Sequence, residues 1–174
     1  MNILARLKKF RPSPITLILL GAIAYVWFRP PAQVTDENRP LPPVMVSQLN
    51  GQIIDLQALR GKVVLISYWA TWCPYCRHEM PAMEKFYTDY KARGFEILAV
   101  SIDDDPAKVV EFMREEGYHF PAAMSDPALD AVIGKVSMVP TSFLLDKQGR
   151  VRKKISGQVH YARLQELVEP LLKE

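Results

Sequence analysis

The chain alternates between apolar runs of the strand type and segments whose apolar residues repeat with helical spacing. Two nearly continuous apolar runs have the form of buried parallel strands: KVVLISYWA (62–70) and FEILAVSI (95–102). Helical periodicity follows each of them, over residues 74–93 and 105–117. The C-terminal residues 161–173 have the same period and predict an amphipathic helix.

Shorter strands are expected in two hairpins. Residues 44–56 place Asn50-Gly51 between two apolar stretches, a combination typical of a tight β-turn. TSFLLD and VRKKIS flank the turn DKQG (146–149) and predict a second hairpin. Between them, residues 119–134 predict a short strand and a short helix. Because strands alternate with helices, we predict an α/β fold with a central mixed β-sheet flanked by helices.

The N-terminal segment has a different character. Residues 1–11 carry four basic side chains and no acid, and residues 15–28 are uncharged and mostly apolar. This order is typical of an exported segment whose N-terminus stays in the cytoplasm. We expect residues 1–29 to be a signal-anchor or transmembrane segment that is not cleaved, because bulky residues occupy 25–28, where cleavage requires small ones. A cleaved signal and a buried helix are the alternatives.

A proline-rich segment follows. Residues 30–43 read PPAQVTDENRPLPP and contain five prolines and few residues to bury. This composition predicts an extended, semi-rigid linker over residues 30–40. The folded domain is then expected to span residues 41–174 and to be soluble and redox-active by itself.

Charge and cysteine content exclude several classes of function. The 174 residues carry a net charge of +3, and the first eleven residues supply much of it. No broad basic face is therefore expected, and a nucleic-acid partner is not predicted. Two cysteines cannot build a disulfide framework, and the loop between them is too short for a useful staple.

The two cysteines stand where a predicted strand passes into a predicted helix. Cys73 precedes the helix start, so its sulfur faces unpaired backbone N–H groups and the positive end of the helix dipole, which favour a thiolate. Pro74 fits the first helical position. Cys76 lies one turn further on, close enough to attack a disulfide formed at Cys73. The arrangement predicts thiol–disulfide exchange through a mixed disulfide.

Two kinds of metal site compete with this interpretation. A structural zinc site needs four ligands, and a Cu(I) site would use both thiolates with a histidine as third ligand. Either would have to recruit histidines that show no metal-binding spacing. These are His78, His119 and His160.

The residues around the cysteines resemble a known family. GKVVLISYWATWCPYCRHEMP, together with the later VPTSFLLDKQGRV, is similar to the thioredoxin superfamily and resembles its membrane-anchored TlpA/ResA-like branch, which includes the thioredoxins of cytochrome c maturation. The resemblance covers residues 41–174. It implies a thioredoxin-like fold with an N-terminal β-hairpin and a helix–strand unit inserted between Ser101 and Pro140.

The resemblance also assigns roles to residues. It implies that Cys73 is the attacking nucleophile and Cys76 the resolving thiol. Val139-Pro140 matches the cis-proline loop, which faces the cysteines and pairs with the substrate backbone. The substrate-binding residues would be Trp72, Pro74, Tyr75, Val139 and Pro140.

One acidic residue sets the branch apart from ordinary thioredoxin. Thioredoxin carries a buried acid six residues before its first active cysteine, where this chain has Ser67. The branch instead carries a glutamate just beyond the second cysteine, which Glu79 matches. Glu79 is three residues after Cys76 and is therefore a candidate for proton transfer to and from that thiol. Its alternative is an acid that merely suits the helix dipole.

These features together predict a periplasmic thiol:disulfide reductase on the bacterial inner membrane. Its partners would be protein disulfide substrates and a membrane electron donor, possible clients being apocytochrome c or a copper-site protein. We expect a monomer without a cofactor beyond the Cys73–Cys76 disulfide, and no metal. A weak oxidant or isomerase, or a copper-delivery module, is the alternative.

Overall fold

The structure is a computed structural model of the chain. It describes residues 13–27, with side chains up to residue 21, and residues 33–134 and 136–174. The chain divides into two compact units, 1–31 and 32–174.

The N-terminal unit contains one described helix. Helix α2 (Pro14–Trp27) has 14 residues and covers most of the predicted apolar segment. None of the helices in the described part of the chain combines the length and apolar character that crossing a membrane requires. Residues 1–12 and 28–29 of the predicted anchor lie outside the described residues.

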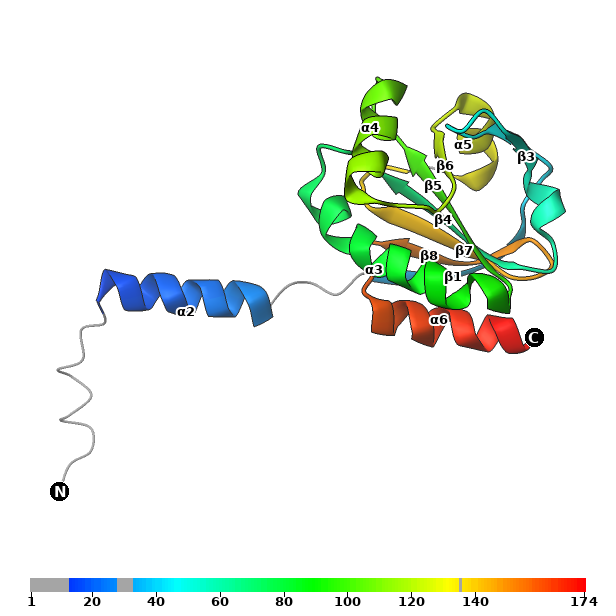
Figure 1. Cartoon of the computed structure of the whole chain (residues 1–174). Coiled ribbons are helices and arrows are strands. Elements are labelled where there is room, and N and C mark those ends of the chain that lie inside the picture. Colours follow the sequence, from blue (N-terminus) through cyan, green and yellow to red (C-terminus); the bar gives the residue numbers. More distant parts are fainter. Residues whose placement is uncertain (1–12, 28–32, 135) are drawn as a thin grey trace. The chain divides into compact units, whose positions relative to one another are not determined.

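A six-stranded sheet forms the centre of the second unit (Figure 1). Its order is β1-β8-β7-β4-β5-β6. The β4–β5 and β5–β6 pairs are parallel and the other three are antiparallel, so the predicted mixed sheet is confirmed. The strands are β1 (Gln33–Pro40), β4 (Val63–Trp69), β5 (Phe95–Ser101), β6 (Ala122–Met124), β7 (Thr141–Leu145) and β8 (Arg150–Ser156).

Hydrophobic cores lie on both faces of the sheet. Every residue of β4 and β5 is buried, as their continuous apolar runs predict. One core joins one face of the sheet to three helices, and the other joins the opposite face to α5 and the N-terminal hairpin. The helices are α3 (Pro74–Tyr90), α4 (Pro106–Glu116), α5 (Pro127–Ile133) and α6 (Tyr161–Lys173), with short 3-10 turns η1 (Leu56–Leu59) and η2 (Lys91–Arg93).

Both predicted hairpins are confirmed. β2 (Met45–Ser47) pairs with β3 (Ile53–Asp55) in a separate two-stranded sheet, and β7 pairs with β8 in the main one. In the first turn, the Asn50 side chain accepts a hydrogen bond from the Gln52 N–H at 3.0 Å. Gly51 has φ of 84°, a conformation that favours glycine.

Three helices have an N-cap residue that is followed directly by proline. Asp105 accepts from the Ala107 N–H at 3.0 Å before α4, and Asp126 accepts from the Leu129 N–H at 2.9 Å before α5. The residue after each cap is proline, as it is in α3, where Cys73 occupies the cap position. Proline fits this position because the first N–H of a helix has no partner within the helix.

The prediction of a linker over residues 30–40 is wrong for residues 33–40, which form β1. This strand pairs antiparallel with β8, from Gln33 opposite Ser156 to Pro40 opposite Arg150. Its proline does not interrupt the ladder because it ends an edge strand. The domain therefore begins near residue 32 rather than 41.

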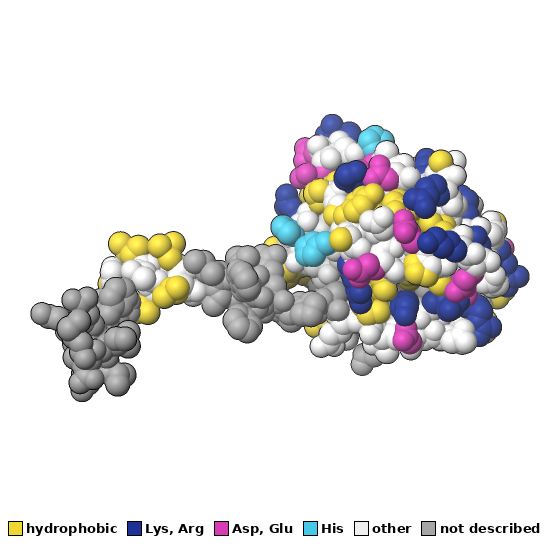
Figure 2. All heavy atoms as spheres, turned by 90° about the horizontal axis from the view of Figure 1, so that it is seen from below, with side chains coloured by type: hydrophobic (Ala, Val, Ile, Leu, Met, Phe, Trp, Pro, Cys, Tyr) yellow, Lys and Arg dark blue, Asp and Glu magenta, His cyan; other side chains and the backbone are white. Residues whose placement is uncertain are grey.

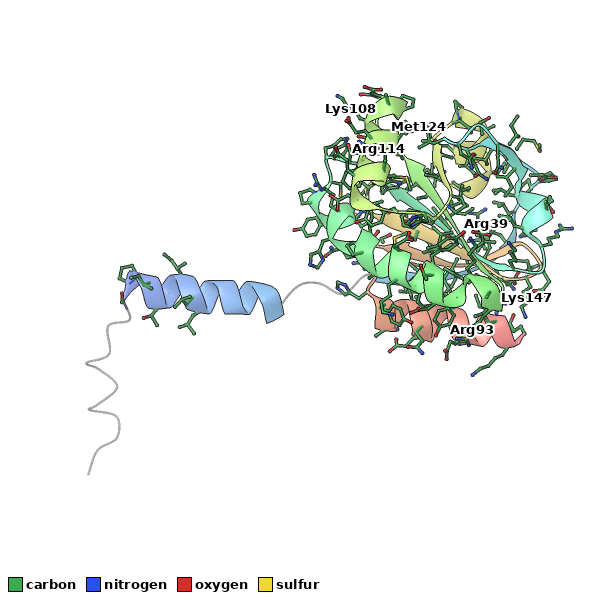
Figure 3. The ribbon with its side chains drawn as sticks, viewed as in Figure 1. Arg39, Arg93, Lys108, Arg114, Met124 and Lys147 are labelled. Carbon is green, nitrogen blue, oxygen red and sulfur yellow. The ribbon has the colours of Figure 1, made fainter. Side chains whose placement is uncertain are left out.

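β1 also contacts a segment far along the chain. Arg39, labelled in Figure 3, donates to the carbonyl of Val132 at 2.9 Å and to that of Ile133. These carbonyls belong to the last turn of α5, where a cation complements the helix dipole. The N-terminal strand thereby holds the helix that precedes the Val139-Pro140 loop.

Charges of both signs are mixed on the surface. On the face drawn in Figure 2, Lys and Arg side chains are interspersed with Asp and Glu side chains. Ion pairs such as Arg163–Glu166 (2.7 Å) and Lys85–Asp89 (2.7 Å) reflect this mixing.

Removal of β1 should destabilise the domain. A chain that begins at Leu41 loses the β1–β8 ladder, and we expect its free energy of unfolding to fall by about 2–4 kcal/mol, since each backbone hydrogen bond contributes about 0.5–1.5 kcal/mol. Urea unfolding measures this change, with a chain that begins at Ala32 as the control. Equal unfolding midpoints for the two chains would show that residues 33–40 are a linker after all.

Candidate active site

The predicted site residues meet where the central strands of the main sheet end. β4 ends at Trp69, β5 ends beside it at Ser101, and the antiparallel β7 begins at Thr141. The chain leaves β4, turns through Ala70 and enters α3 at Pro74. The Cys73 sulfur and the Val139-Pro140 loop therefore lie at the same end of these strands.

Cys73 is the N-cap of α3. Its backbone is extended, with φ of −87° and ψ of 110°, and its Sγ accepts a hydrogen bond from the Cys76 N–H at 3.3 Å. Both cysteines are free, so the structure describes the reduced form. The predicted contact between the Cys73 sulfur and the helix N–H groups is confirmed.

Cys76 lies deeper, with an exposed fraction of 0% against 4% for Cys73. Burial raises the pKa of the Cys76 thiol, and the neighbouring Cys73 sulfur and Glu79 carboxyl raise it further. The Cys76 thiol therefore holds its proton at neutral pH. A thiol of this kind becomes a nucleophile only when a nearby group takes that proton.

Glu79 is buried one turn after Cys76. Its Oε2 accepts from the Val159 N–H at 2.9 Å, whereas its Oε1 is buried and has no partner among the described residues. Burial raises the pKa of Glu79 from 4.5 to about 8, and the Val159 hydrogen bond offsets only part of this rise. Near pH 7 this carboxyl is therefore mostly protonated, and a rise in pH through about 8 ionises it.

The Val139–Pro140 peptide bond is cis, as the resemblance implied. The Val139 carbonyl oxygen lies 3.8 Å from the Cys73 Sγ. Two hydrogen bonds hold the loop: Thr141 Oγ1 donates to the Met138 carbonyl at 2.8 Å, and the Gly157 N–H donates to the Pro140 carbonyl at 2.9 Å. This loop therefore lies directly against the sulfur.

The predicted substrate-binding side chains differ in exposure. Trp72 is 65% exposed, and Pro74 and Tyr75 are also exposed, whereas Val139 is half-buried and Pro140 buried. The Tyr75 carbonyl accepts from the Gln158 Nε2 at 2.8 Å. Exposed aromatic side chains beside a reactive sulfur suit contact with another protein.

Sequence reasoning missed Asp103. Its carboxylate accepts from the Thr71 N–H (2.9 Å), Thr71 Oγ1 (2.6 Å) and Ser101 Oγ (2.7 Å). Burial opposes ionisation here, but these hydrogen bonds outweigh it and lower the pKa of Asp103. The loop before Trp72 and Cys73 is thereby tied to the end of β5. Asp103 is the first of three consecutive aspartates after a buried strand, but this run alone did not indicate which of them binds Thr71.

The histidines of the alternative metal sites have other partners than the two cysteines among the described residues. His119 Nδ1 lies 3.0 Å from Glu84 Oε1, and His78 Nδ1 lies 3.1 Å from Gln158 Nε2. The His78 and His160 rings are 6.1 Å apart, centroid to centroid. Across the part of the chain that the structure describes, no three His, Cys, Asp or Glu side chains form a group that could hold a metal ion.

Comparisons with known proteins agree with this geometry. The Redoxin family model matches residues 36–167. The thiol-disulfide oxidoreductase ResA of Bacillus cereus is 37% identical over 149 residues, covering 83% of this chain and 85% of the relative. ResA of Bacillus subtilis is 33% identical, covering 85% and 84%.

The chain belongs to the Redoxin family. It is a TlpA/ResA-like member of the thioredoxin superfamily and a thiol-disulfide oxidoreductase. A thiol:disulfide interchange protein of Chlorobium tepidum superposes on the redoxin domain with a TM-score of 0.73 and 27% identity, over 79% of this chain and 99% of the other. A secreted thiol-disulfide isomerase of Corynebacterium glutamicum superposes with a TM-score of 0.74 and 25% identity, over 84% and 95%.

The two cysteines should react at different rates. In the folded, reduced redoxin domain we expect iodoacetamide to label Cys73 at least about tenfold faster than Cys76, because burial keeps the Cys76 thiol protonated and covered. Mass spectrometry of partly labelled protein measures the ratio, and labelling in urea is the control. Equal labelling of both cysteines in the folded protein would contradict the assigned order.

Proposed function

We propose that this protein reduces disulfides of other proteins outside the cytoplasm, with Cys73 as the attacking thiolate and Cys76 as the resolving thiol. The observation that carries the proposal is the burial of two neighbouring side chains, Cys76 and Glu79. Cys76 keeps its proton, and Glu79 beside it has a pKa of about 8. The resolving thiol is thus stored in an unreactive form together with a group that can activate it.

The proposed reaction has two steps. The Cys73 thiolate attacks one sulfur of the client disulfide, a mixed disulfide forms, and the other client sulfur leaves with the bond's electron pair. Cys76 then transfers its proton to the Glu79 carboxylate and attacks Cys73 Sγ. The second client sulfur departs as a thiolate, and Cys73 and Cys76 end as a disulfide. Two electrons reach the client, and a separate donor must later restore the dithiol.

Glu79 gives the second step a pH dependence. Only its ionised form accepts the proton, and the ionised fraction grows as the pH rises through about 8. Resolution therefore accelerates from neutral to mildly alkaline pH. The partnerless Oε1 supports this role, because a purely structural carboxyl would be expected to have both oxygens hydrogen-bonded.

Burial of Cys76 supports the direction of electron flow. A dithiol becomes a strong oxidant when its reduced form is stabilised, as happens when its thiolates are stabilised. Here burial raises the pKa of the Cys76 thiol, so Cys76 contributes no stabilisation of this kind to the reduced form. The isomerase alternative draws on the names of two similar structures, from Corynebacterium glutamicum and Bacteroides thetaiotaomicron, which both include the word isomerase.

The N-terminal sequence supports a location outside the cytoplasm. The basic residues 1–11 and the apolar residues 15–28 support an inner-membrane attachment with the catalytic domain on the periplasmic side. The secreted relative supports the same side of the membrane. The donor would then be a membrane protein that passes thiol electrons outward, and the domain would act as a monomer. Clients of this chemistry include cysteine pairs that later bind haem or copper.

The direction of electron flow can be measured in glutathione buffers of known potential. We expect a Cys73–Cys76 midpoint more negative than about −200 mV, which is required of a reductase. The Cys76→Ser variant should lose catalytic reduction of insulin and accumulate a mixed disulfide at Cys73, whereas Cys73→Ser should form none. A midpoint of about −120 mV, which is typical of a strong oxidant, would overturn the reductase assignment.

A further inference from the structure

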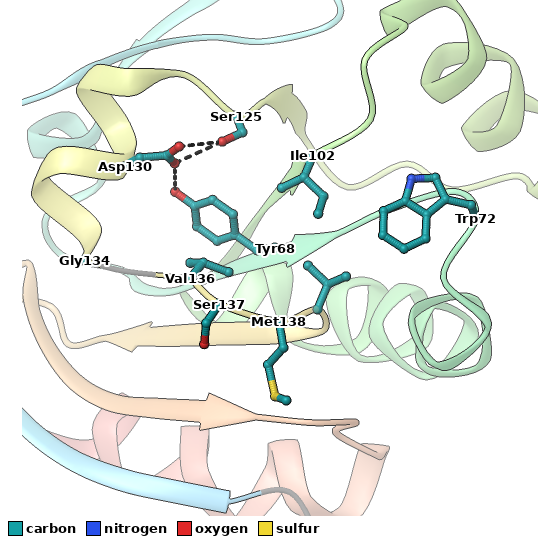
Figure 4. Close-up of a pocket in the computed structure, with 10 residues that line it drawn as sticks. Tyr68, Trp72, Ile102, Ser125, Asp130, Gly134, Val136, Ser137 and Met138 are labelled. Atoms are coloured by element: carbon teal, nitrogen blue, oxygen red, sulfur yellow. Dashed lines mark hydrogen bonds between the residues drawn. The ribbon is translucent and has the colours of Figure 1, made fainter.

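Trp72, the residue before the catalytic cysteine, lines a pocket of about 570 Å³ (Figure 4). Trp72 stands at one end of it, next in sequence to Cys73, and Asp130 of α5 stands at the other. Val139 also lines the pocket, and its carbonyl is the group that lies 3.8 Å from the Cys73 sulfur. A client chain bound at the sulfur would therefore have this pocket within reach of its side chains.

The pocket has apolar walls and one charged group. The walls are mostly hydrophobic, and Asp130 is the one ionisable acid or base among the described lining residues apart from the Tyr68 hydroxyl. The apolar members are Trp72, Ile102, Val136, Met138 and Val139. This combination suits a side chain with a long apolar stem and a cationic end.

Hydrogen bonds hold the Asp130 carboxylate in place. Tyr68 Oη donates to Oδ1 at 2.8 Å, and Ser125 Oγ lies 3.0 Å from Oδ1 and 2.8 Å from Oδ2. Burial and the bond to Asp130 raise the pKa of Tyr68, so its hydroxyl remains a donor. These partners are neutral and leave the negative charge of the carboxylate in place.

Asp130 has no cationic partner within the described chain. None of the ion pairs among described residues includes it. Arg39, which reaches the last turn of the same helix, pairs with Glu37 at 3.0 Å. Within residues 33–134 and 136–174, the carboxylate therefore meets no positive charge.

We propose that this pocket is a specificity subsite, which binds a lysine or arginine side chain located close to the client's disulfide-bonded cysteine. The stem lies along the walls between Trp72 and Val136, and the cation pairs with Asp130. The subsite rests on the proposed function, because it serves the same Cys73 reaction. It makes this protein prefer basic client segments.

The test uses short peptides that differ at one position. Each peptide carries one cysteine as a mixed disulfide with thionitrobenzoate, and either Lys or Gln beside the cysteine. The Cys73 thiolate attacks the peptide sulfur, the S–S bond breaks, and the coloured thionitrobenzoate anion leaves with its electron pair. Capture can thus be timed independently of the direction of electron flow in the cell.

We expect the full-length protein to capture the Lys peptide about three- to fivefold faster than the Gln peptide. This difference is the size expected of a partly exposed ion pair. The Asp130→Asn variant keeps the shape of the side chain, and its Lys-to-Gln ratio should fall to about one. Asp104→Asn removes an exposed carboxylate that does not line the pocket, and its ratio should stay at the wild-type value. Raising the ionic strength from ~0.02 to ~0.5 M should reduce the wild-type ratio.

The possible outcomes separate the subsite from the proposed function. A wild-type ratio of about one, or an unchanged ratio in Asp130→Asn, overturns the subsite, whatever the reductase activity. A Lys preference that depends on Asp130, in a protein that does not reduce insulin, supports the subsite and contradicts the reductase assignment.

Discussion

The hydrogen bond from the Cys76 N–H to the Cys73 sulfur organises the rest of the site. It places the sulfur at the start of α3, where the Cys73 side chain caps the first turn of the helix. It requires β4 to end and α3 to begin within a few residues, which the buried strand and Pro74 provide. Asp103 holds the intervening loop from the side of β5, and the Val139-Pro140 loop closes the site from the side of β7.

The next turn of α3 buries the carboxyl group of Glu79, which lowers the stability of the fold at high pH. The pKa of Glu79 is raised in the folded chain, so the native state binds more protons than the unfolded chain between about pH 4.5 and 8. The stability associated with protonated Glu79 is fully present below the unfolded value and is lost as the pH rises through about 8. A buried acid that weakens the fold under working conditions is typical of a functional site. In the proposed mechanism, this loss of stability is the counterpart of a proton acceptor beside the resolving thiol.

Local pattern was sufficient to predict most elements of this fold. Residues that are neighbours in the sequence determine the continuous apolar runs of β4 and β5. The same holds for the Asn50-Gly51 turn and for the prolines at the helix starts. The position of Cys73 at a helix start followed from the same signals, whereas the cis bond before Pro140 followed from the resemblance alone.

The features that sequence reasoning missed depend on contacts between distant residues. Polar residues and prolines make residues 33–40 look like a linker, and they become a strand because β8, over a hundred residues later, supplies the partner. Asp103 gains its role from Thr71, and the pocket forms only where α5 and the 136–139 loop approach Tyr68 and Trp72. Such contacts leave no periodic trace in the chain.

The proposed mechanism depends on Glu79 as the proton acceptor stored beside Cys76. A carbon-13 NMR titration of the Glu79 carboxyl in the reduced protein tests it most directly, with Glu79→Gln used to assign the signal. We expect a midpoint near 8, because burial disfavours the carboxylate. A midpoint near the 4.5 of an ordinary glutamate would show that the carboxyl is ionised throughout the working range, and it would contradict this role.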